Sequence, residues 1–438
     1  FTYPRLLRFV LPAVGTMLFT SIYGIVDGLC VSNFVGKTAF AAVNLIMPLP
    51  MLLGTIGFML GTGGSAIVGI TLGEGDQKKA DRYFTLFLLA ALVSVSVLAV
   101  LGIVFLRPIA VLLGAKGELL DYAVRYGRIL MVSLPTFALQ NMFQSFFVTA
   151  EKPHLGFWFT VGAGCTNMVL DVLMVGIWGW GVEGAAIATF ISQLVGGVLP
   201  VFYFIDRSNS SRLHLCKTSF YSKVLRDACI NGSSELMTNL SMSLVNILYN
   251  YQLLRLAGEN GVAAYGVIMY AAFLFVAVFV GYAVGSAPIV SFHYGARNHA
   301  EVHNLYRKSL RLIAVVAVTL TLASMFIIPC VARIFVGYDA ELLALTSRAF
   351  RLYALSFLIM GFNVYASSFF TALGDGVTSA LISFLRTLAF QVIAILLLPL
   401  LLGIDGIWLA VTAAELAALA VSAAMLLTKD KVFHYRKA

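Results

Sequence analysis

The chain has 438 residues, of which 60% are hydrophobic and 11% are charged, and its mean hydropathy is +0.94. A soluble protein of this length needs many more polar residues to cover its surface, so the composition excludes a water-soluble globular protein. The formal net charge is +9. In a membrane protein this excess is explained by loops that face anionic lipid, so it gives no support to nucleic-acid binding.

Apolar runs of about twenty or more residues recur along the whole chain, and each is long enough to cross a bilayer core of about 30 Å. The charged residues cluster between these runs. We therefore predict an all-α, polytopic membrane protein with twelve transmembrane helices, at roughly 6–34, 41–71, 84–106, 126–149, 154–178, 182–204, 226–256, 262–292, 309–335, 350–373, 377–401 and 404–427.

The basic residues of the loops predict the orientation. With the N-terminus inside, the predicted cytoplasmic segments hold 19 Lys and Arg residues and the outer loops hold 9; Arg386, inside the eleventh helix, completes the 29. Cytoplasmic loops of membrane proteins carry an excess of basic residues. We therefore expect a multi-pass protein with both termini in the cytoplasm.

The two halves of the chain repeat each other at an offset near 222 residues. Matching positions include Asn141 with Asn363, Glu183-Gly184 with Asp405-Gly406, and Gly64-Ser65-Ala66 with Gly285-Ser286-Ala287. A nearly constant offset over the whole chain indicates a duplication. Six helices per repeat give both halves the same topology, so substrate is expected between two lobes related by an axis along the membrane normal. The predicted lobes are residues 1–205 and 228–438, joined by a cytoplasmic linker at 206–227.

Two carboxylates lie inside the apolar runs, Asp27 in the first predicted helix and Asp171 in the fifth. An ionisable group in the hydrocarbon costs at least a few kcal/mol, so each marks a candidate functional site. At about 1.5 Å per residue, both lie about 27–30 Å along helices that run in the same direction. The two side chains are therefore expected at one level in the outer half, as in a proton or cation site.

Polar residues on neighbouring helices extend this site. Asn167 lies four residues before Asp171 and shares its helical face, and Thr189 in the sixth helix is at a matching depth. An amide, a hydroxyl and two carboxylates can bind a proton or supply oxygen ligands to a small cation. The alternative is a polar cluster that only joins three helices.

The sequence indicates neither metal chemistry nor catalysis. The five cysteines are far apart without CxxC spacing, and the six histidines lie in loops or at helix ends. An intramembrane enzyme would need a nucleophile–base pair or a metal cluster, and a passive channel would need a filter or a ring of charges. We expect no enzyme activity and no cofactor.

Several segments resemble the multidrug and toxic compound extrusion (MATE) family over essentially the whole chain. They are Val26-Asp27 with the following 39–44, Leu72-Gly73-Glu74-Gly75-Asp76, Asn167–Asp171 and Gly181–Thr189. The resemblance implies a V-shaped pair of six-helix lobes that exports cationic or amphipathic compounds against an inward H+ or Na+ gradient. It is closest to the bacterial DinF- and MepA-like branches, because the tenth helix lacks the carboxylate of NorM-type members.

The resemblance also implies roles for individual residues. Asp27, Asn167, Asp171 and Thr189 match the residues that hold the coupling proton or Na+, and Pro12 matches a candidate hinge of the first helix. The coupling ion is the only cofactor expected. The expected partners are small-molecule drugs and membrane lipids, and a monomer in a bacterial cytoplasmic membrane is sufficient for function.

Other polar and thioether side chains are candidates for a substrate cleft, because amides and flexible thioethers suit promiscuous binding. They are Asn44, Met47, Gln140, Asn141, Gln144, Glu235 and Asn363. Glu235 is also interpreted as a solvated vestibule residue, and Arg386 is expected to pair with backbone carbonyls or with Glu415. A lipid-linked precursor flippase of the same superfamily is the alternative function. It would present a strongly cationic cavity, whereas this chain has one intramembrane arginine.

Overall fold

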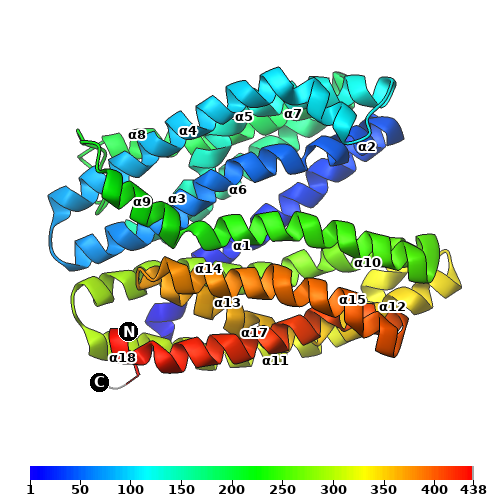
Figure 1. The fold of residues 1–438 in the computed structure, drawn as a ribbon. Coiled ribbons are helices and arrows are strands. Elements are labelled where there is room, and N and C mark those ends of the chain that lie inside the picture. The colour runs from blue at the N-terminus through cyan, green and yellow to red at the C-terminus, as the bar shows by residue number, and fades with distance from the viewer. Residues whose placement is uncertain (437–438) are drawn as a thin grey trace.

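The structure, a computed structural model, describes residues 1–436; the last two residues of the predicted second lobe lie outside this range. The described chain is helical and forms two bundles that lie side by side (Figure 1). The first bundle contains α1 (Tyr3–Phe34), α2 (Lys37–Ile46), α3 (Pro48–Gly73), α4 (Gln77–Leu112), α5 (Glu118–Thr149), α6 (Pro153–Leu170), η1 (Asp171–Ile177), α7 (Gly181–Gln193), η2 (Leu194–Val198) and α8 (Leu199–Ile205).

The second bundle begins after an extended linker. It contains α9 (Ser222–Asn231), α10 (Ser233–Gly295), α11 (His299–Val336), α12 (Ala340–Ala354), α13 (Phe357–Ala372), α14 (Gly376–Phe384), η3 (Leu385–Ala389), α15 (Phe390–Leu402), α16 (Ile404–Trp408), α17 (Ala410–Thr428) and α18 (Asp430–Phe433). The segments η1, η2 and η3 are π-helical.

Nine helices within residues 1–436 are long and apolar enough to cross a membrane, and the bent pair α12–α13 adds a tenth pass. α10 supplies two passes, because its backbone breaks at Gly258 (φ 65°, ψ −152°) and the rings of Tyr249 and Tyr265 stack 4.9 Å apart across the reversal. α5 has 32 residues and completes twelve, although Gln140 and Asn141 make it less apolar. The predicted fold class, a polytopic α-helical protein with two six-helix lobes, is confirmed.

Helix boundaries repeat as the sequence does. Asp76 caps α4 by accepting a hydrogen bond from the Lys79 amide at 3.1 Å, and Asn298 caps α11 by accepting one from the Glu301 amide at 3.1 Å. Such side chains satisfy amides that the first helical turn leaves unpaired. The two caps are 222 residues apart, so the repeat extends to the starts of corresponding helices.

The N-terminus, α18, α9 and the linker lie at the same end of the molecule, called the terminal end below (Figure 1). The two lobes meet there through glycines on α3 and α10. A Cβ atom on Gly73 would lie 2.0 Å from the Phe292 carbonyl oxygen, and one on Gly295 would lie 2.0 Å from the Ile70 carbonyl oxygen. The two backbones therefore touch, which only small residues permit.

The first helix of each half starts against the other lobe. α1 passes from the second bundle into the first (Figure 1), and its residue Val14 is so close that a Cβ on Gly281 of α10 would lie 2.5 Å from the Val14 Cα. In the matching contact, a Cβ on Gly63 of α3 would lie 2.2 Å from the carbonyl oxygen of Ala228 in α9. The first turns of α1 thus pack on the lobe predicted for residues 228–438.

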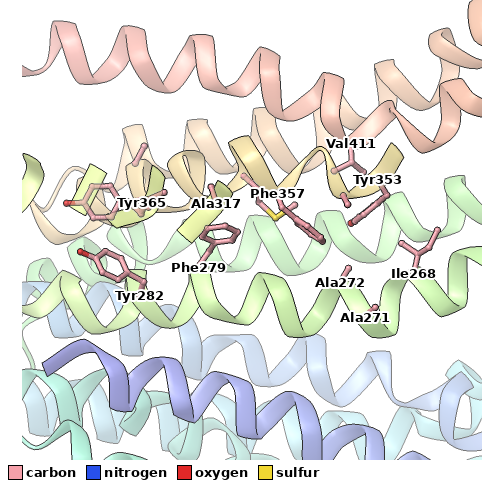
Figure 2. Close-up of a cluster of buried hydrophobic side chains, with 14 of the residues drawn as sticks. Ile268, Ala271, Ala272, Phe279, Tyr282, Ala317, Tyr353, Phe357, Tyr365 and Val411 are labelled. Carbon is pink, nitrogen blue, oxygen red and sulfur yellow. The ribbon is translucent and has the colours of Figure 1, made fainter. Parts of the chain in front are cut away.

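The second lobe has an apolar core built by α10 to α13 and α17. Figure 2 shows Phe279 and Tyr282 of α10 facing Phe357 and Tyr365 of α13. The Tyr282 hydroxyl donates to the Ser309 hydroxyl at 2.7 Å, so this buried polar group has a partner. In a bilayer such contacts stabilise by close packing rather than by excluding water.

Candidate functional site

Asp27 and Asp171 lie together in the interior of the first lobe. The Asp27 residue is 8% exposed and Asp171 is fully buried. Their carboxyl groups are neighbours and interact electrostatically. The two predicted side chains therefore lie next to each other, and their role as a coupling site stays a prediction.

A glycine and a π-helix bring the two carboxyl groups together. A Cβ on Gly164 of α6 would lie 2.3 Å from the Phe19 ring and 2.8 Å from the Tyr23 ring, so only glycine lets α6 approach α1 this closely. Asp171 begins η1, where the i→i+4 hydrogen bonds of α6 give way to wider turns. Such segments are frequent at functional sites, because they turn side chains away from the regular helical register.

Asn167 and Thr189 complete one side of the site. The Asn167 amide nitrogen lies 3.4 Å from the Thr189 hydroxyl oxygen, and that hydroxyl donates to the Ala185 carbonyl at 3.0 Å. Asn167 is one turn from Asp171 on the same buried face of α6. The four residues predicted for the site therefore come from three adjacent helices.

The site has more acceptors than donors. Asp27 Oδ1, both carboxylate oxygens of Asp171 and Asn167 Oδ1 are enclosed and accept no hydrogen bond from any residue in 1–436. Two adjacent carboxylates that receive no hydrogen bond repel each other in an apolar interior. They are stabilised only if a proton neutralises one of them or a cation binds between them. Carboxylate, amide and hydroxyl oxygens are the ligands that a proton or a hard cation such as Na+ requires.

Side chains that were not predicted also surround the pair. Tyr126 of α5 is fully buried near both carboxyl groups, and its hydroxyl lies 3.8 Å from the Met47 sulfur. Tyr23 lies near Asp27 and Gln140, and Cys30 lies near both aspartates. Tyr23 and Cys30 share the helical face of Asp27, so helical spacing would have found them, but no local pattern marks Tyr126.

Two of the predicted cleft residues in the first lobe lie beside this site, Gln140 near Tyr23 and Met47 next to Tyr126. Gln140 and Asn141 are buried, and a Cβ on Gly196 would lie 2.8 Å from the Gln140 side chain, so η2 packs directly on it. The amide nitrogen of Asn141 and the amide oxygen of Gln144 have no partner within the described chain. Met47 contacts Tyr126, whereas Asn44 is exposed.

Pro12 lies within the single helix α1, near the residues that pack on the second lobe. Its carbonyl accepts a hydrogen bond from the Thr16 hydroxyl at 2.9 Å. The residues around it pack on Gly281 and Gly285 of α10, and Asp27 follows four turns later in the first lobe. Its role as a hinge stays a prediction.

The second lobe holds a buried ion pair, whereas the first holds two buried aspartates. Arg386 Nε donates to Glu415 Oε1 at 2.9 Å, which confirms Glu415 as the partner expected for this arginine. Asn363 Nδ2 donates to Glu415 Oε2 at 2.7 Å, and the Ser422 hydroxyl donates to Asn363 Oδ1 at 3.0 Å. Asn363 is thus fully buried, and both its amide nitrogen and its amide oxygen are hydrogen-bonded. Glu235 is half-buried at the start of α10.

Comparison with known proteins identifies the family. The MatE family profile matches twice, over residues 12–173 and 236–397, which is one match for each repeat. The chain belongs to the MatE family. This confirms the family predicted from the sequence.

MATE relatives of known structure share the fold over almost the full length. A MATE transporter solved in an outward-facing conformation and described as a multidrug resistance member superimposes with a TM-score of 0.92 at 23% identity, over 99% of this chain and 96% of that chain. A Vibrio cholerae MATE transporter, VcmN, gives a TM-score of 0.90 at 18% identity, over 99% and 98%. Multidrug export protein MepA of Staphylococcus saprophyticus is 21% identical over 98% of this chain and 94% of its own length. At these identities the solved structures show the fold.

Proposed function

We propose that this protein exports amphipathic, mainly cationic compounds across a bacterial cytoplasmic membrane in exchange for H+ or Na+ bound at Asp27 and Asp171. The observation that carries the proposal is the enclosed pair of carboxyl groups, three of whose oxygens accept no hydrogen bond from residues 1–436. The names of the MepA relatives, which are multidrug export proteins, support a multidrug substrate range. The basic loops support cytoplasmic termini, and no step of the proposal involves a chemical reaction of the substrate.

Coupling follows from competition between two conformations. A bound proton or cation neutralises the aspartate pair and draws α1 and α6 together. When no ion is bound, the two charged carboxylates repel each other. Substrate and coupling ion exchange only if each prefers a different arrangement of the lobes. The site lies where α1 continues from its contact with the second lobe, so a change at Asp27 acts directly on a helix that both lobes hold.

The flippase alternative receives less support. A cavity for a pyrophosphate needs several free basic groups, but the intramembrane Arg386 is already paired with Glu415. Drug export therefore remains the better-supported function.

The test is efflux of ethidium from liposomes that contain purified protein, under an imposed pH gradient, with and without Na+. We expect wild type to transport under at least one gradient and Asp27→Asn and Asp171→Asn to lose gradient-driven efflux while remaining folded. Glu118→Gln is the matched control, because it removes an exposed carboxylate outside the site and should transport normally. Full gradient-driven efflux in both aspartate variants would contradict the proposal.

A further inference from the structure

The linker between the lobes is fastened to the first lobe. The backbone amide of His214 donates a hydrogen bond to the Asp81 carboxylate of α4 at 3.1 Å. The Lys152 ammonium, in the loop after α5, donates to the Ser210 hydroxyl at 2.7 Å. These bonds hold a segment that forms neither helix nor strand before α9. We therefore expect the linker to move with the first lobe when the two lobes change their relative position.

One side chain of the linker reaches the second lobe. The guanidinium carbon of Arg212 lies 5.5 Å from the centroid of the Phe292 ring in α10. Phe292 also packs against the apolar core of the first lobe, which includes Leu72 and Phe84. A guanidinium over the face of an aromatic ring is attracted to it electrostatically. Phe292 belongs to the second lobe but is thus held by the core and by the linker of the first.

A carboxylate of the first lobe holds Arg212 in this position. The Arg212 Nε lies 3.3 Å from Glu151 Oε1, and the two side chains are about half exposed. The Gln77 side-chain amide also donates a hydrogen bond to the Arg212 carbonyl. Both the backbone and the side chain of Arg212 are therefore fixed, and Glu151 acts as a positioning residue for the guanidinium over Phe292.

The backbone of Glu151 is in a conformation that favours glycine. Its φ is 61°, and its amide donates to the Val148 carbonyl at 3.0 Å. The second lobe forms the same turn with Gly374, whose φ is 84° and whose amide donates to the Thr371 carbonyl at 3.0 Å. Glycine adopts this left-handed conformation without the steric cost that a Cβ adds. A glutamate at such a position indicates a use for its carboxylate other than forming the turn.

A cavity of about 310 Å³ lies between the lobes at this place. Glu151, Arg212 and Phe292 line it, together with Thr149 of the first lobe and Pro288 of the second. Because Glu151 and Arg212 are also half exposed, they lie at its mouth. A cavity removes packing contacts between the two sides. Closure of the lobes therefore depends more strongly here on the few contacts at the mouth.

We propose that Glu151 and Arg212 form a clasp on Phe292 that holds the terminal end closed and releases Phe292 when the lobes part there. The clasp is one-sided, because Ile70, the position of the first lobe that corresponds to Phe292 at the offset of 222 residues, has no ring for a guanidinium. The inference rests on the alternating access implied by the proposed function, and it gives the linker a role in setting the balance between closed and open states.

A buried reporter cysteine measures this balance. Ser291 is fully buried and faces Gly69 across the contact between the lobes, so Ser291→Cys should react with N-ethylmaleimide only when the lobes part. The reporter is made in a chain whose five native cysteines are replaced by Ala, and the rate is measured in detergent without gradient or substrate. Arg212→Gln should raise the rate about threefold to fivefold, because an ion pair and a cation–π contact are lost. Lys217→Gln, which changes an exposed basic residue of the same linker, should leave the rate unchanged.

Glu151→Gly separates the clasp from a purely structural role. It removes the carboxylate and also relieves the left-handed backbone conformation. The temperature of unfolding should therefore stay the same or rise, whereas the reporter should react about twofold to fivefold faster. A residue that served only stability would change the two measurements together, with a lower temperature of unfolding and a faster reaction.

Salt provides an independent test of the same contact. Raising the ionic strength from about 0.05 M to about 0.5 M screens exposed charges, so it should speed the reaction of the reporter in the parent chain and have little effect in Arg212→Gln. Ser324→Cys is the second control. Ser324 is fully buried in α11, which packs on other helices of the second lobe, so its rate should not respond to the clasp variants.

Two results would overturn the proposal. One is a reporter at Ser291 that reacts at the parent rate, or not at all, in both Arg212→Gln and Glu151→Gly. The other is an equal rise at Ser324, which would show that the whole fold has loosened. Because no gradient is applied, loss of coupling at Asp27 would not affect these rates, and failure of the clasp would leave the proposed export of cations standing.

Discussion

At the scale of single residues, the two lobes treat their buried carboxylates in opposite ways. Both oxygens of Glu415 have donors, from Arg386 and Asn363. In contrast, both oxygens of Asp171 and one of Asp27 have none within the described chain. A polar cluster that only joined helices would satisfy its own hydrogen bonds, because unsatisfied buried groups are expensive. The deficit in the first lobe is therefore better explained by an exchangeable ion.

Thr189→Val tests the contribution of the hydroxyl next to this pair. The variant keeps the shape of the side chain but removes the oxygen that lies 3.4 Å from the Asn167 amide nitrogen. One lost hydrogen bond corresponds to about 1 kcal/mol, so the concentration of H+ or Na+ that gives half-maximal ethidium efflux should rise about fivefold. Thr412→Val is the control, because the Thr412 hydroxyl has no partner among residues 1–436, and it should leave this concentration unchanged.

The sequence revealed the aspartates but not their full surroundings. A carboxylate in an apolar helix is conspicuous, and helical spacing adds Asn167 to Asp171. Tyr126 also lies near both aspartates, yet a tyrosine in a transmembrane helix gives no signal of its own. Its place depends on how α5 packs against α1, which no local pattern contains.

At the scale of helices, glycines decide how closely the lobes approach. Gly73→Ala would place a Cβ 2.0 Å from the Phe292 carbonyl oxygen, and a backbone atom cannot move aside as a flexible side chain can. We expect the free energy of unfolding to fall by about 1–3 kcal/mol, as for other overpacked contacts. The midpoint of unfolding in a mixed-detergent titration measures this.

Gly266→Ala is the matched control for that experiment. Gly266 also lies within a membrane helix, but a Cβ there would meet nothing within 4 Å. Removing a glycine from a helix interior should leave stability unchanged or raise it slightly. A fall of the same size in both variants would show that the added methyl group destabilises the helices wherever it is placed, and that the contact between lobes is not responsible.

The helices themselves were largely predictable, and their irregularities were not. Hydropathy and length gave all twelve passes, including the reversal near Gly258. The predicted helix 41–71 is divided at Met47 and Pro48 into α2 and α3, and the predicted linker 206–227 already contains the start of α9. The π-helical segments η1, η2 and η3 were not predicted, because a wider turn changes neither length nor hydropathy enough to be seen.

At the scale of the whole molecule, the duplication predicted the two lobes but not how they hold each other. The first turns of α1 lie on α10, and α9 lies on α3, so each half begins on the other half. Amphipathic periodicity shows which face of a helix is buried but not which helix covers it. The glycines of α3 and α10 at the terminal end gave no such information either, because a glycine in a helix does not indicate which backbone lies opposite it.

If transport uses alternating access, the contact between α3 and α10 at the terminal end must open. Gly69 and Ser291 face each other across it, with 2.8 Å between an ideal Cβ on Gly69 and the Ser291 Cβ. A disulfide needs about 3.8 Å, so a small shift allows Gly69→Cys and Ser291→Cys to join the lobes. The pair is made in a chain whose five native cysteines, all free, are replaced by Ala.

Oxidation of this double variant should abolish ethidium efflux, and reduction should restore it, because the cross-link holds α3 against α10 at the terminal end. Each single cysteine variant, treated with the same oxidant, should transport as before. If the cross-linked protein still transported at the full rate, the contact between Gly69 and Ser291 would be a fixed pivot. The lobes would then have to exchange access by moving around it, and the opening would lie elsewhere.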